Sequence, residues 1–576
     1  MRALLHWLWR YRAWIAGGLL CLGIIDGMQT LVPFLLRAAI DDLSAGHADR
    51  LTLLAGGMLL IGVLMVGLRF FWRFLLFGAA RRIRRDLRLA LHAQLVRLDA
   101  GFRHGRSTGE QMALATSDID AVNQACGFGM MAVFDAVFLI LFSVAAMIHL
   151  SPALALITCL PLPLVALCEW RMGKVLYRCY DRSQTTFAVL TEQVREALVG
   201  VRTLKAHARE ADCSRALERA NQDNLQAWLR VSRIDSVFEP AIMFLAGVPA
   251  VVALLFGGRA VLDGTMSLGD FVAFVAVLSL LAWPMMAIGW SVNLWTRGAA
   301  SMSRIQTVLD TVPAITSPTN AVRMPTDSGI TLEAVSVRYP SAERDALRDL
   351  SVHIAAGGML GIVGPTGSGK STLADLLVRM NDPTHGVVRL GGCDLRTLVL
   401  NDLRRTVAIV PQEPFVFALS IAENLAFARP EASTAEIEAA AQAACLHEEI
   451  LCLPQGYTTL LGERGITLSG GQRQRLAIAR ALLQDPAVLV LDDCLSALDA
   501  ATETQVLANL RQARRGRTAV VISHRIRTIA DANLTLVLDH GHVIERGTHA
   551  ELLAVGGLYA RLHALQQAEQ ALEERA

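Results

Sequence analysis

The sequence predicts two fold classes in one chain: an α-helical transmembrane bundle of six spans with long cytoplasmic helix extensions, followed by an α/β domain. Hydrophobic residues make up 53% of the 576 residues and charged residues 18%, and the mean hydropathy is +0.41. This balance is typical of a membrane protein. The apolar excess lies before residue 300, and strand-like runs alternate with helical stretches after it, as in an α/β domain.

Six apolar stretches are long enough to cross a bilayer, which takes about 20 residues each. They are residues 14–40, 51–77, 128–149, 151–171, 238–262 and 268–292. The short connection at 149–152 predicts a tight hairpin between the third and fourth spans. The segments after spans two and four are low in proline, which favours continuous helices running past the membrane over separate soluble inserts.

The basic residues predict the orientation of these spans. The two long segments after spans two and four are rich in arginine, whereas the connections at 41–50, 149–152 and 263–267 carry little beyond Arg50. The positive-inside rule then places both long segments, both termini and everything after residue 300 in the cytoplasm.

The domains are predicted as a transmembrane domain at 1–310, a linker at 311–329, an α/β domain at 330–565 and a charged helical tail at 566–576. Three prolines mark the linker. Strand-like runs lie at 330–337, 359–363, 406–410, 488–491, 518–522 and 534–538. Their alternation with helical stretches predicts a largely parallel core sheet.

Composition disfavours two classes of site. The net charge of +2 gives no indication of a nucleic-acid partner. The ten cysteines show no CxxC pairs or metal-ligand spacing, and several, such as Cys21 and Cys126, lie in or beside apolar segments. Buried small apolar residues are therefore favoured over a disulfide framework or a zinc site.

A glycine-rich loop follows the apolar strand predicted at 359–363, and an apolar helix follows the loop at 372–380. The segment predicted to bind the nucleotide consists of Gly364, Pro365, Thr366, Gly367, Ser368, Gly369, Lys370, Ser371 and Thr372. It matches G-x-x-x-x-G-K-[ST] in the strand–loop–helix setting that this motif needs. Backbone N–H groups can wrap phosphates at such a helix N-terminus. Lys370 is predicted to reach the β and γ phosphates, and the Ser371 hydroxyl to ligate Mg²⁺.

A second pair of motifs lies further along the chain. Its first part is Leu468, Ser469, Gly470, Gly471 and Gln472, and its second is the apolar run 488–491 ending in Asp492 and Asp493. The glycine pair suits close approach to a phosphate. A carboxylate at the end of a buried strand commonly holds Mg²⁺ beside a nucleotide, which assigns Asp492 to the metal. Asp493 lies where a general base is expected.

Together these motifs resemble an ATP-binding-cassette (ABC) exporter half-transporter, in which six spans are fused to one P-loop ATPase domain. The resemblance covers nearly the whole chain. It implies that Tyr339 stacks on adenine, that Gln412 links Mg²⁺ and the attacking water to the membrane domain, and that His524 is the switch histidine. Residues 468–472 match the family signature, which completes the ATP site of a partner domain. A dimer that uses ATP and Mg²⁺ is therefore implied.

The resemblance also implies the residues that couple the domains. Residues 496–499 match the loop that contacts the partner domain, and 462–465 match an exporter-specific loop. That loop touches two short coupling helices, which by position fall near 102–108 and 200–207.

Asp493 departs from the family pattern, where glutamate usually polarises the attacking water. Aspartate is one methylene shorter, which draws the carboxylate back by about 1.5 Å. General-base geometry tolerates little error, so we predict a slow or inactive site on this chain's own phosphate loop. The alternative is that a small shift lets Asp493 work. The pattern resembles the degenerate-site subunit of heterodimeric bacterial multidrug exporters and favours a heterodimer over a homodimer.

Polar residues within predicted spans are costly and so indicate function. They are Asp26, Gln29, Arg69, Arg73 and Asp135. Either Asp26 or Asp135 faces a transport cavity, or these groups pair within the bundle and Arg73 reaches the membrane surface.

The resemblance favours amphipathic drugs or lipids as substrates, moved out of the cytoplasm or inner leaflet across a bacterial inner membrane. A nucleotide-gated channel or regulatory subunit stays open as an alternative, because Asp493 permits ATP binding with little hydrolysis.

Overall fold

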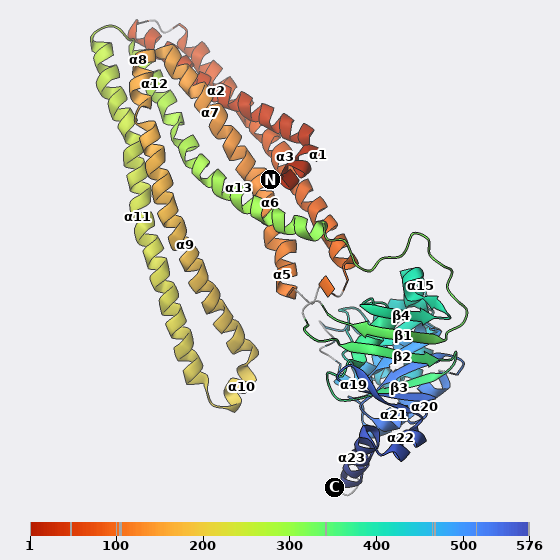
Figure 1. Ribbon diagram of the computed structural model, residues 1–576. Coiled ribbons are helices and arrows are strands. Elements are labelled where there is room, and N and C mark those ends of the chain that lie inside the picture. The colour runs from red at the N-terminus through yellow and green to blue at the C-terminus, as the bar shows by residue number, and fades with distance from the viewer. Residues whose placement is uncertain are drawn as a thin grey trace. The chain divides into compact units, whose positions relative to one another are not determined.

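The computed structural model describes residues 2–46, 49–99, 101–102, 106–339, 342–462, 465, 468–513 and 515–573. The chain divides into two compact units. The first is Met1–Val96 with Thr108–Thr311, and the second is Arg97–Ser107 with Val312–Ala576. The first contains long helices, and the second contains strands with shorter helices around them (Figure 1).

Every element described in the first unit is a helix. The α-helices are α1 (Arg2–Arg10), α2 (Arg12–Ser44), α3 (Leu51–Arg97), α5 (Thr108–Ala113), α6 (Ile119–Gln124), α7 (Met130–Leu150), α8 (Pro152–Cys159), α9 (Leu162–Val199), α10 (Val201–Ala206), α11 (Glu210–Leu262), α12 (Leu268–Leu280) and α13 (Ala282–Leu309). Two π-helical turns, Leu114–Asp118 and Ala125–Gly129, join α5, α6 and α7 into one run.

Within the described residues, five helical runs are long and apolar enough to cross a membrane. They are α2, α3, Thr108–Leu150, α11 and Leu268–Leu309. These runs contain five of the predicted spans, but 151–171 is not among them, so six spans are not confirmed. The physical reason is the break between α8 and α9 at Leu160 and Pro161, because proline lacks an N–H and disfavours helix at the residue before it.

The tight hairpin predicted at 149–152 is observed. Helix α7 ends at Leu150, and Ser151 is the N-cap of α8, whose first residue is Pro152. The Ser151 side chain accepts a hydrogen bond from the backbone N–H of Leu154 (3.4 Å). Serine at the cap followed by proline in the first turn is a strong helix-start signal.

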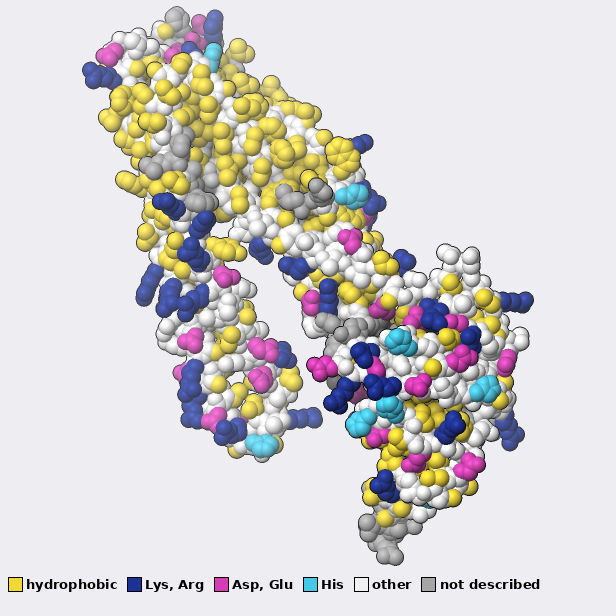
Figure 2. Space-filling view, in the orientation of Figure 1, with side chains coloured by type: hydrophobic (Ala, Val, Ile, Leu, Met, Phe, Trp, Pro, Cys, Tyr) yellow, Lys and Arg dark blue, Asp and Glu magenta, His cyan; other side chains and the backbone are white. Residues whose placement is uncertain are grey.

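The continuous helices predicted after spans two and four are also observed. Helix α3 has 47 residues, α9 has 38 and α11 has 53, so separate soluble inserts are ruled out. Helices α9 and α11 pack along each other and are joined by α10, a six-residue helix within the predicted coupling segment 200–207 (Figure 1). Figure 2 shows hydrophobic side chains over most of the helical unit and Lys and Arg gathered along the α9–α11 hairpin.

The second unit contains two sheets. Its strands are β1 (Ile330–Val337), β2 (Leu347–Ile354), β3 (Met359–Val363), β4 (His385–Leu390), β5 (Cys393–Asp394), β6 (Val407–Val410), β7 (Val488–Asp492), β8 (Thr518–Ile522), β9 (Leu534–Asp539) and β10 (His542–Gly547). The larger sheet has the order β10-β9-β3-β8-β7-β6. Its strands pair in parallel except β10 with β9, which confirms the largely parallel sheet. The smaller sheet, β2-β1-β4-β5, is antiparallel and was not predicted.

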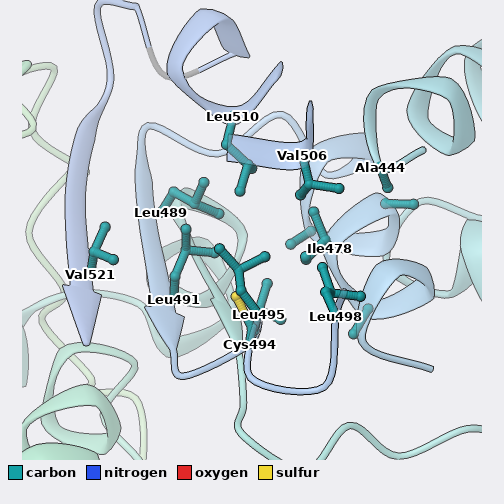
Figure 3. Packing of buried hydrophobic residues seen from close by; sticks show 14 of the residues in the cluster. Ala444, Ile478, Leu489, Leu491, Cys494, Leu495, Leu498, Val506, Leu510 and Val521 are labelled. Carbon is teal, nitrogen blue, oxygen red and sulfur yellow. The ribbon is translucent and has the colours of Figure 1, made fainter. Parts of the chain in front are cut away.

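The helices of the second unit are mostly short. They are α14 (Lys370–Leu377), α15 (Leu400–Thr406), α16 (Ile421–Leu425), α17 (Thr434–Ala443), α18 (His447–Leu451), α19 (Gly470–Leu483), α20 (Ala500–Ala513), α21 (Ile526–Ile529), α22 (His549–Val555) and α23 (Leu558–Glu573). Leu491 of β7, Val521 of β8 and Ile478 of α19 belong to one buried cluster (Figure 3). This packing fixes the strand ends and the start of α19, where the motifs lie.

Candidate nucleotide-binding site

The phosphate-loop motif joins β3 to α14. All five residues of β3 are buried, which anchors the loop in the centre of the large sheet. Gly367 and Gly369 have φ of +81° and +100°, a conformation that glycine adopts without the cost other residues pay. A Cβ added at Gly364 would lie 2.9 Å from Oγ of Ser368. The shape of the loop therefore depends on these glycines.

Lys370, the first residue of α14, turns its ammonium back onto this loop. The Nζ group donates hydrogen bonds to the carbonyl oxygens of Gly364 (2.9 Å) and Pro365 (2.7 Å). Burial lowers the pKa of Lys370, while the nearby charges of Asp492 and Asp493 act in the opposite direction. A phosphate oxygen is a stronger acceptor for this ammonium than a neutral carbonyl.

Ser371 and Asp492 lie together, as the sequence predicts for a metal site. The Ser371 side chain lies close enough to the Asp492 carboxylate to lower its pKa. Burial is the main cause that raises the pKa of Asp492, and the charge of Asp493 adds to it, whereas Ser371, Lys370 and His524 lower it. A buried carboxylate beside a hydroxyl offers the oxygen ligands that Mg²⁺ prefers, and a divalent cation would offset the cost of the buried charge.

Gln412, the third predicted metal ligand, is exposed in the loop after β6. In the described part of the chain, no hydrogen bond joins its side chain to Ser371 or Asp492. Its approach to the metal stays a prediction.

Asp493 and His524 lie side by side because β7 and β8 are neighbouring parallel strands. The backbone N–H of Asp493 donates to the carbonyl of Ile522 (2.9 Å). The backbone N–H of His524 donates to Oδ1 of Asp493 at 3.4 Å. Asp493 has a φ of +46°, a region that aspartate tolerates better than most residues. The candidate base is therefore close to the backbone of the candidate switch residue.

Tyr339, the predicted adenine platform, reaches the start of α14. Its hydroxyl lies 3.2 Å from the hydroxyl of Thr372. A residue just after β1 and the end of the phosphate-loop segment, more than 30 positions apart in sequence, are thus brought to one place.

The signature residues form the first turn of α19. Ser469 caps the helix: its Oγ accepts from the backbone N–H of Gln472 (3.2 Å), and Oε1 of Gln472 accepts from the N–H of Ser469 (2.8 Å). Leu468 is buried in the core, and a Cβ at Gly471 would lie 3.0 Å from the carbonyl oxygen of Ala497. In the described part of the chain, no hydrogen bond joins the signature to the phosphate loop.

Two further residues that the sequence did not single out, Gln474 and Arg480, tie the site together. Gln474 donates to Ser496 (3.2 Å) and accepts from the N–H of Ala497 (3.0 Å), which holds the 496–499 loop against α19. Arg480 donates to the carbonyl of Phe415 (3.1 Å) in the loop after Gln412. Only Gln474, two residues after the signature, had a sequence signal.

Gln566 connects the C-terminal helix α23 to the switch loop. Its Nε2 donates to the carbonyl of His524 (2.5 Å), and its Oε1 accepts from the N–H of Ile526 (2.9 Å). Helix α23 continues to Glu573. Of the 462–465 loop, Glu463 and Arg464 lie outside the described residues, as do residues 103–105 of the first predicted coupling segment.

Two family models match this chain. Residues 15–285 match the ABC transporter transmembrane region, and residues 347–496 match the ABC transporter domain. The chain is 36% identical to the multidrug resistance-like ATP-binding protein MdlA of Escherichia coli, covering 99% of this chain and 98% of that protein. It is 34% identical to YheI of Bacillus subtilis, a probable multidrug resistance ABC transporter ATP-binding/permease protein, covering 94% and 93%.

A solved structure shares the fold of the whole chain. A bacterial Atm1-family ABC exporter with ATP bound superposes with a TM-score of 0.83 and 27% identity, covering 96% of this chain and 99% of that one. The chain therefore belongs to the ABC transporter family, as an exporter whose transmembrane domain is fused to one nucleotide-binding domain and whose ATPase activity is coupled to transport.

Proposed function

We propose that this chain is one half of a heterodimeric ABC exporter and that its own phosphate loop forms the slower of two ATP sites. The observation that carries this proposal is the position of Asp493, whose short side chain reaches the backbone N–H of His524. A glutamate there would extend about 1.5 Å further. A carboxylate drawn back by that distance is a poor base for water at the γ phosphate.

In the proposed site, each residue near the phosphates has one role. Lys370 exchanges its two carbonyl partners for the β and γ phosphates, whose charge it neutralises. Ser371, Asp492 and Gln412 hold Mg²⁺, which supplies charge stabilisation for the transferred phosphoryl group when bound. Asp493 orients water.

The remaining site residues bind the nucleotide from its two ends. Tyr339 stacks on the adenine ring, and the loop from Gly364 to Thr372 surrounds the phosphates. His524 contacts the γ phosphate. Two nucleotide-binding domains enclose each ATP, so the signature at 468–472 completes a site in the partner subunit, and the partner's signature completes this one.

We further propose that the chain keeps an intact signature for a hydrolysis site whose catalytic glutamate belongs to the partner. The capping box at Ser469 and Gln472 supports this, because it holds the first turn of α19 in a defined shape. Closure of the two domains on ATP then switches the membrane helices from inward- to outward-facing, and hydrolysis resets them.

The proposed substrates are amphipathic drugs or lipids, moved out of the cytoplasm or the inner leaflet of a bacterial inner membrane. The names of the relatives, which refer to multidrug resistance, support a drug-like substrate. We propose that both termini are cytoplasmic, that the transmembrane and nucleotide-binding domains occupy 1–310 and 330–565, and that α8 with the start of α9 forms a sixth span. A homodimeric exporter is the second candidate, and a nucleotide-gated channel or regulatory subunit the third.

The test is to isolate the tagged full-length chain from its native membrane and identify what copurifies. We expect a second half-transporter in equal amount, with glutamate after its Mg²⁺ aspartate. Replacing that glutamate with glutamine should abolish ATP turnover, whereas Asp493→Asn in this chain should leave most of it. Rapid ATP turnover by a complex that contains only this chain would contradict the heterodimer.

A further inference from the structure

The first unit contains a large open cavity that the nucleotide chemistry does not use. It has a volume of about 1040 Å³ and lies where α2, α3 and α7 meet. Four arginines line it: Arg69, Arg73, Arg81 and Arg82. No acidic side chain is among the described residues that line it. We call it the arginine–aromatic cavity.

The ion pairs of two neighbouring arginines of α3 distinguish them from these four guanidinium groups. In the described part of the chain, none of the four forms an ion pair, whereas Arg84 and Arg85 on the same helix pair with Asp120 (3.2 Å) and Asp86 (2.8 Å). Arg69 lies near the carboxylates of Asp26 and Asp135 in the bundle. The other three cations therefore remain available to an anion.

Arg82 is the cation whose surroundings most clearly favour binding of an anion. Its guanidinium lies 3.5 Å from the centre of the Trp14 ring, so one face is covered by an aromatic surface, as in a cation–π contact. Its Nη1 atom is buried and has no hydrogen-bond partner among the described residues. A buried donor without an acceptor is costly. The guanidinium is thus oriented by the ring and carries one donor without a partner among the described residues, and a ligand oxygen would supply that partner.

The rest of the cavity wall is aromatic. Phe70, Phe74 and Phe128 line it, and Phe70 and Phe74 are 66% and 56% exposed and stack on each other. The lining runs along one face of α3 from Val66 to Arg82, which corresponds to about 24 Å at 1.5 Å per residue. An apolar surface of this length, followed by cations, matches a long molecule with an acidic head.

The position of the cavity along α3 also favours a long molecule with an acidic head. The helix exposes a run of large apolar side chains before the cavity, including Leu59 and Val63, and arginines follow from Arg81 onward. The cavity therefore crosses the boundary between hydrocarbon and water, whichever side of the membrane it faces. Basic pockets at this depth favour anionic headgroups.

We propose that the arginine–aromatic cavity binds an anionic amphiphile. The acidic head lies between the guanidinium groups of Arg73, Arg81 and Arg82, and the apolar body lies along Phe70 and Phe74. A membrane phospholipid and a free amphiphile share this chemistry. The inference requires only that the chain is an integral membrane protein, and it does not depend on the proposed heterodimer or on the rate of the Asp493 site.

The experiment uses the full-length chain in phosphatidylcholine nanodiscs without nucleotide, so a failure of the ATPase proposal does not affect it. One arm adds a minor fraction of phosphatidylglycerol and counts retained anionic lipid by native mass spectrometry. The other arm titrates dodecyl phosphate and follows tryptophan fluorescence, because Trp14 and Trp72 line the cavity. Dodecyltrimethylammonium is the probe of opposite charge.

The test variant is the double substitution Arg73→Gln and Arg82→Gln. The matched control is Arg88→Gln with Arg97→Gln, which removes the same charge from exposed positions of α3 outside the cavity. The test variant should bind the anionic probes about 20-fold more weakly, from roughly 1 kcal/mol per arginine at a membrane surface. The control should change less than about twofold.

Binding in the phospholipid arm identifies a membrane lipid as the source, and binding in the dodecyl phosphate arm identifies a free amphiphile; either supports the site. If the double variant does not fold, the single variants Arg73→Gln and Arg81→Gln should each weaken binding by about fivefold. The proposal is overturned by the absence of binding in both arms, by equal losses in the test and control variants, or by equally tight binding of dodecyltrimethylammonium.

Discussion

If the ATP site of this chain is slow, as proposed above, replacing Asp493 with glutamate should convert it into a fast one. The aspartate carboxylate lies against the backbone N–H of His524, at 3.4 Å. One added methylene moves the carboxylate outward by about 1.5 Å. Since an error of 1 Å in a reacting group can cost about 10²-fold in rate, kcat should rise by about 100-fold, or ~2.7 kcal/mol in the activation free energy.

The same substitution should leave ATP binding unchanged and cost some stability. The phosphate contacts proposed for Lys370 do not involve residue 493, so KM for ATP should stay within about twofold. The backbone at this position has a φ of +46°, which suits aspartate and asparagine better than glutamate. The Tm of Asp493→Glu should therefore fall slightly, and Asp493→Asn, which fits the backbone but lacks a base, should keep its Tm and lose residual turnover.

The assay is steady-state phosphate release by the reconstituted full-length chain. In a heterodimer, the same gain should appear in a complex whose partner glutamate has been replaced with glutamine. The reasoning is refuted if the wild-type site already turns over at an ordinary rate, about 10 s⁻¹, and Asp493→Glu changes it by less than threefold. The carboxylate of Asp493 would then be long enough to act on the attacking water.

Three other substitutions test the site. Lys370→Ala should weaken ATP binding by at least about tenfold, measured with a fluorescent ATP analogue, because it removes the charge-assisted contacts to phosphate. Asp492→Asn should abolish hydrolysis yet raise the nucleotide-free Tm by about 2–4 °C at pH 7. Burial raises the pKa of Asp492, so the ionised carboxylate lowers the stability of the folded protein at any pH above the unfolded pKa. The difference in Tm between variant and wild type should vanish as acidification protonates the wild-type carboxyl group. Gln566→Ala should lower kcat about tenfold by releasing the His524 loop from two hydrogen bonds, with ATP affinity unchanged; the exposed neighbour Gln567→Ala should have no effect, and equal losses in both would contradict the role of Gln566.

Much of the large sheet could be predicted because its strands are continuous apolar runs. The predicted strands 359–363 and 518–522 coincide with β3 and β8 of this sheet, and both are buried throughout. The predicted strand 330–337 coincides with β1 of the smaller sheet. Strand β2 was missed because buried residues alternate there with exposed ones such as Arg348 and Asp349. Charged residues on one open face hide an antiparallel strand from a search for apolar runs.

The contacts within the site depend on topology that the sequence does not display. Motif spacing predicted the phosphate loop and the proximity of Ser371 to Asp492, whose pKa Ser371 lowers. The approach of Asp493 to His524 arises because β7 and β8, 30 positions apart, are sheet neighbours. Gln566 lies further away in sequence, and a single glutamine carries no pattern, so its role became visible only when α23 was placed beside the switch loop.

In the proposed dimer, the helix cap at Ser469 has a consequence for how quickly the signature can bind the ATP of the partner subunit. A serine hydroxyl has one proton to give and two lone pairs, and capping α19 uses only a lone pair, on the N–H of Gln472. The proton remains free for a phosphate oxygen. The first turn is thus already folded before any nucleotide arrives, so little conformational entropy needs to be lost when the nucleotide binds.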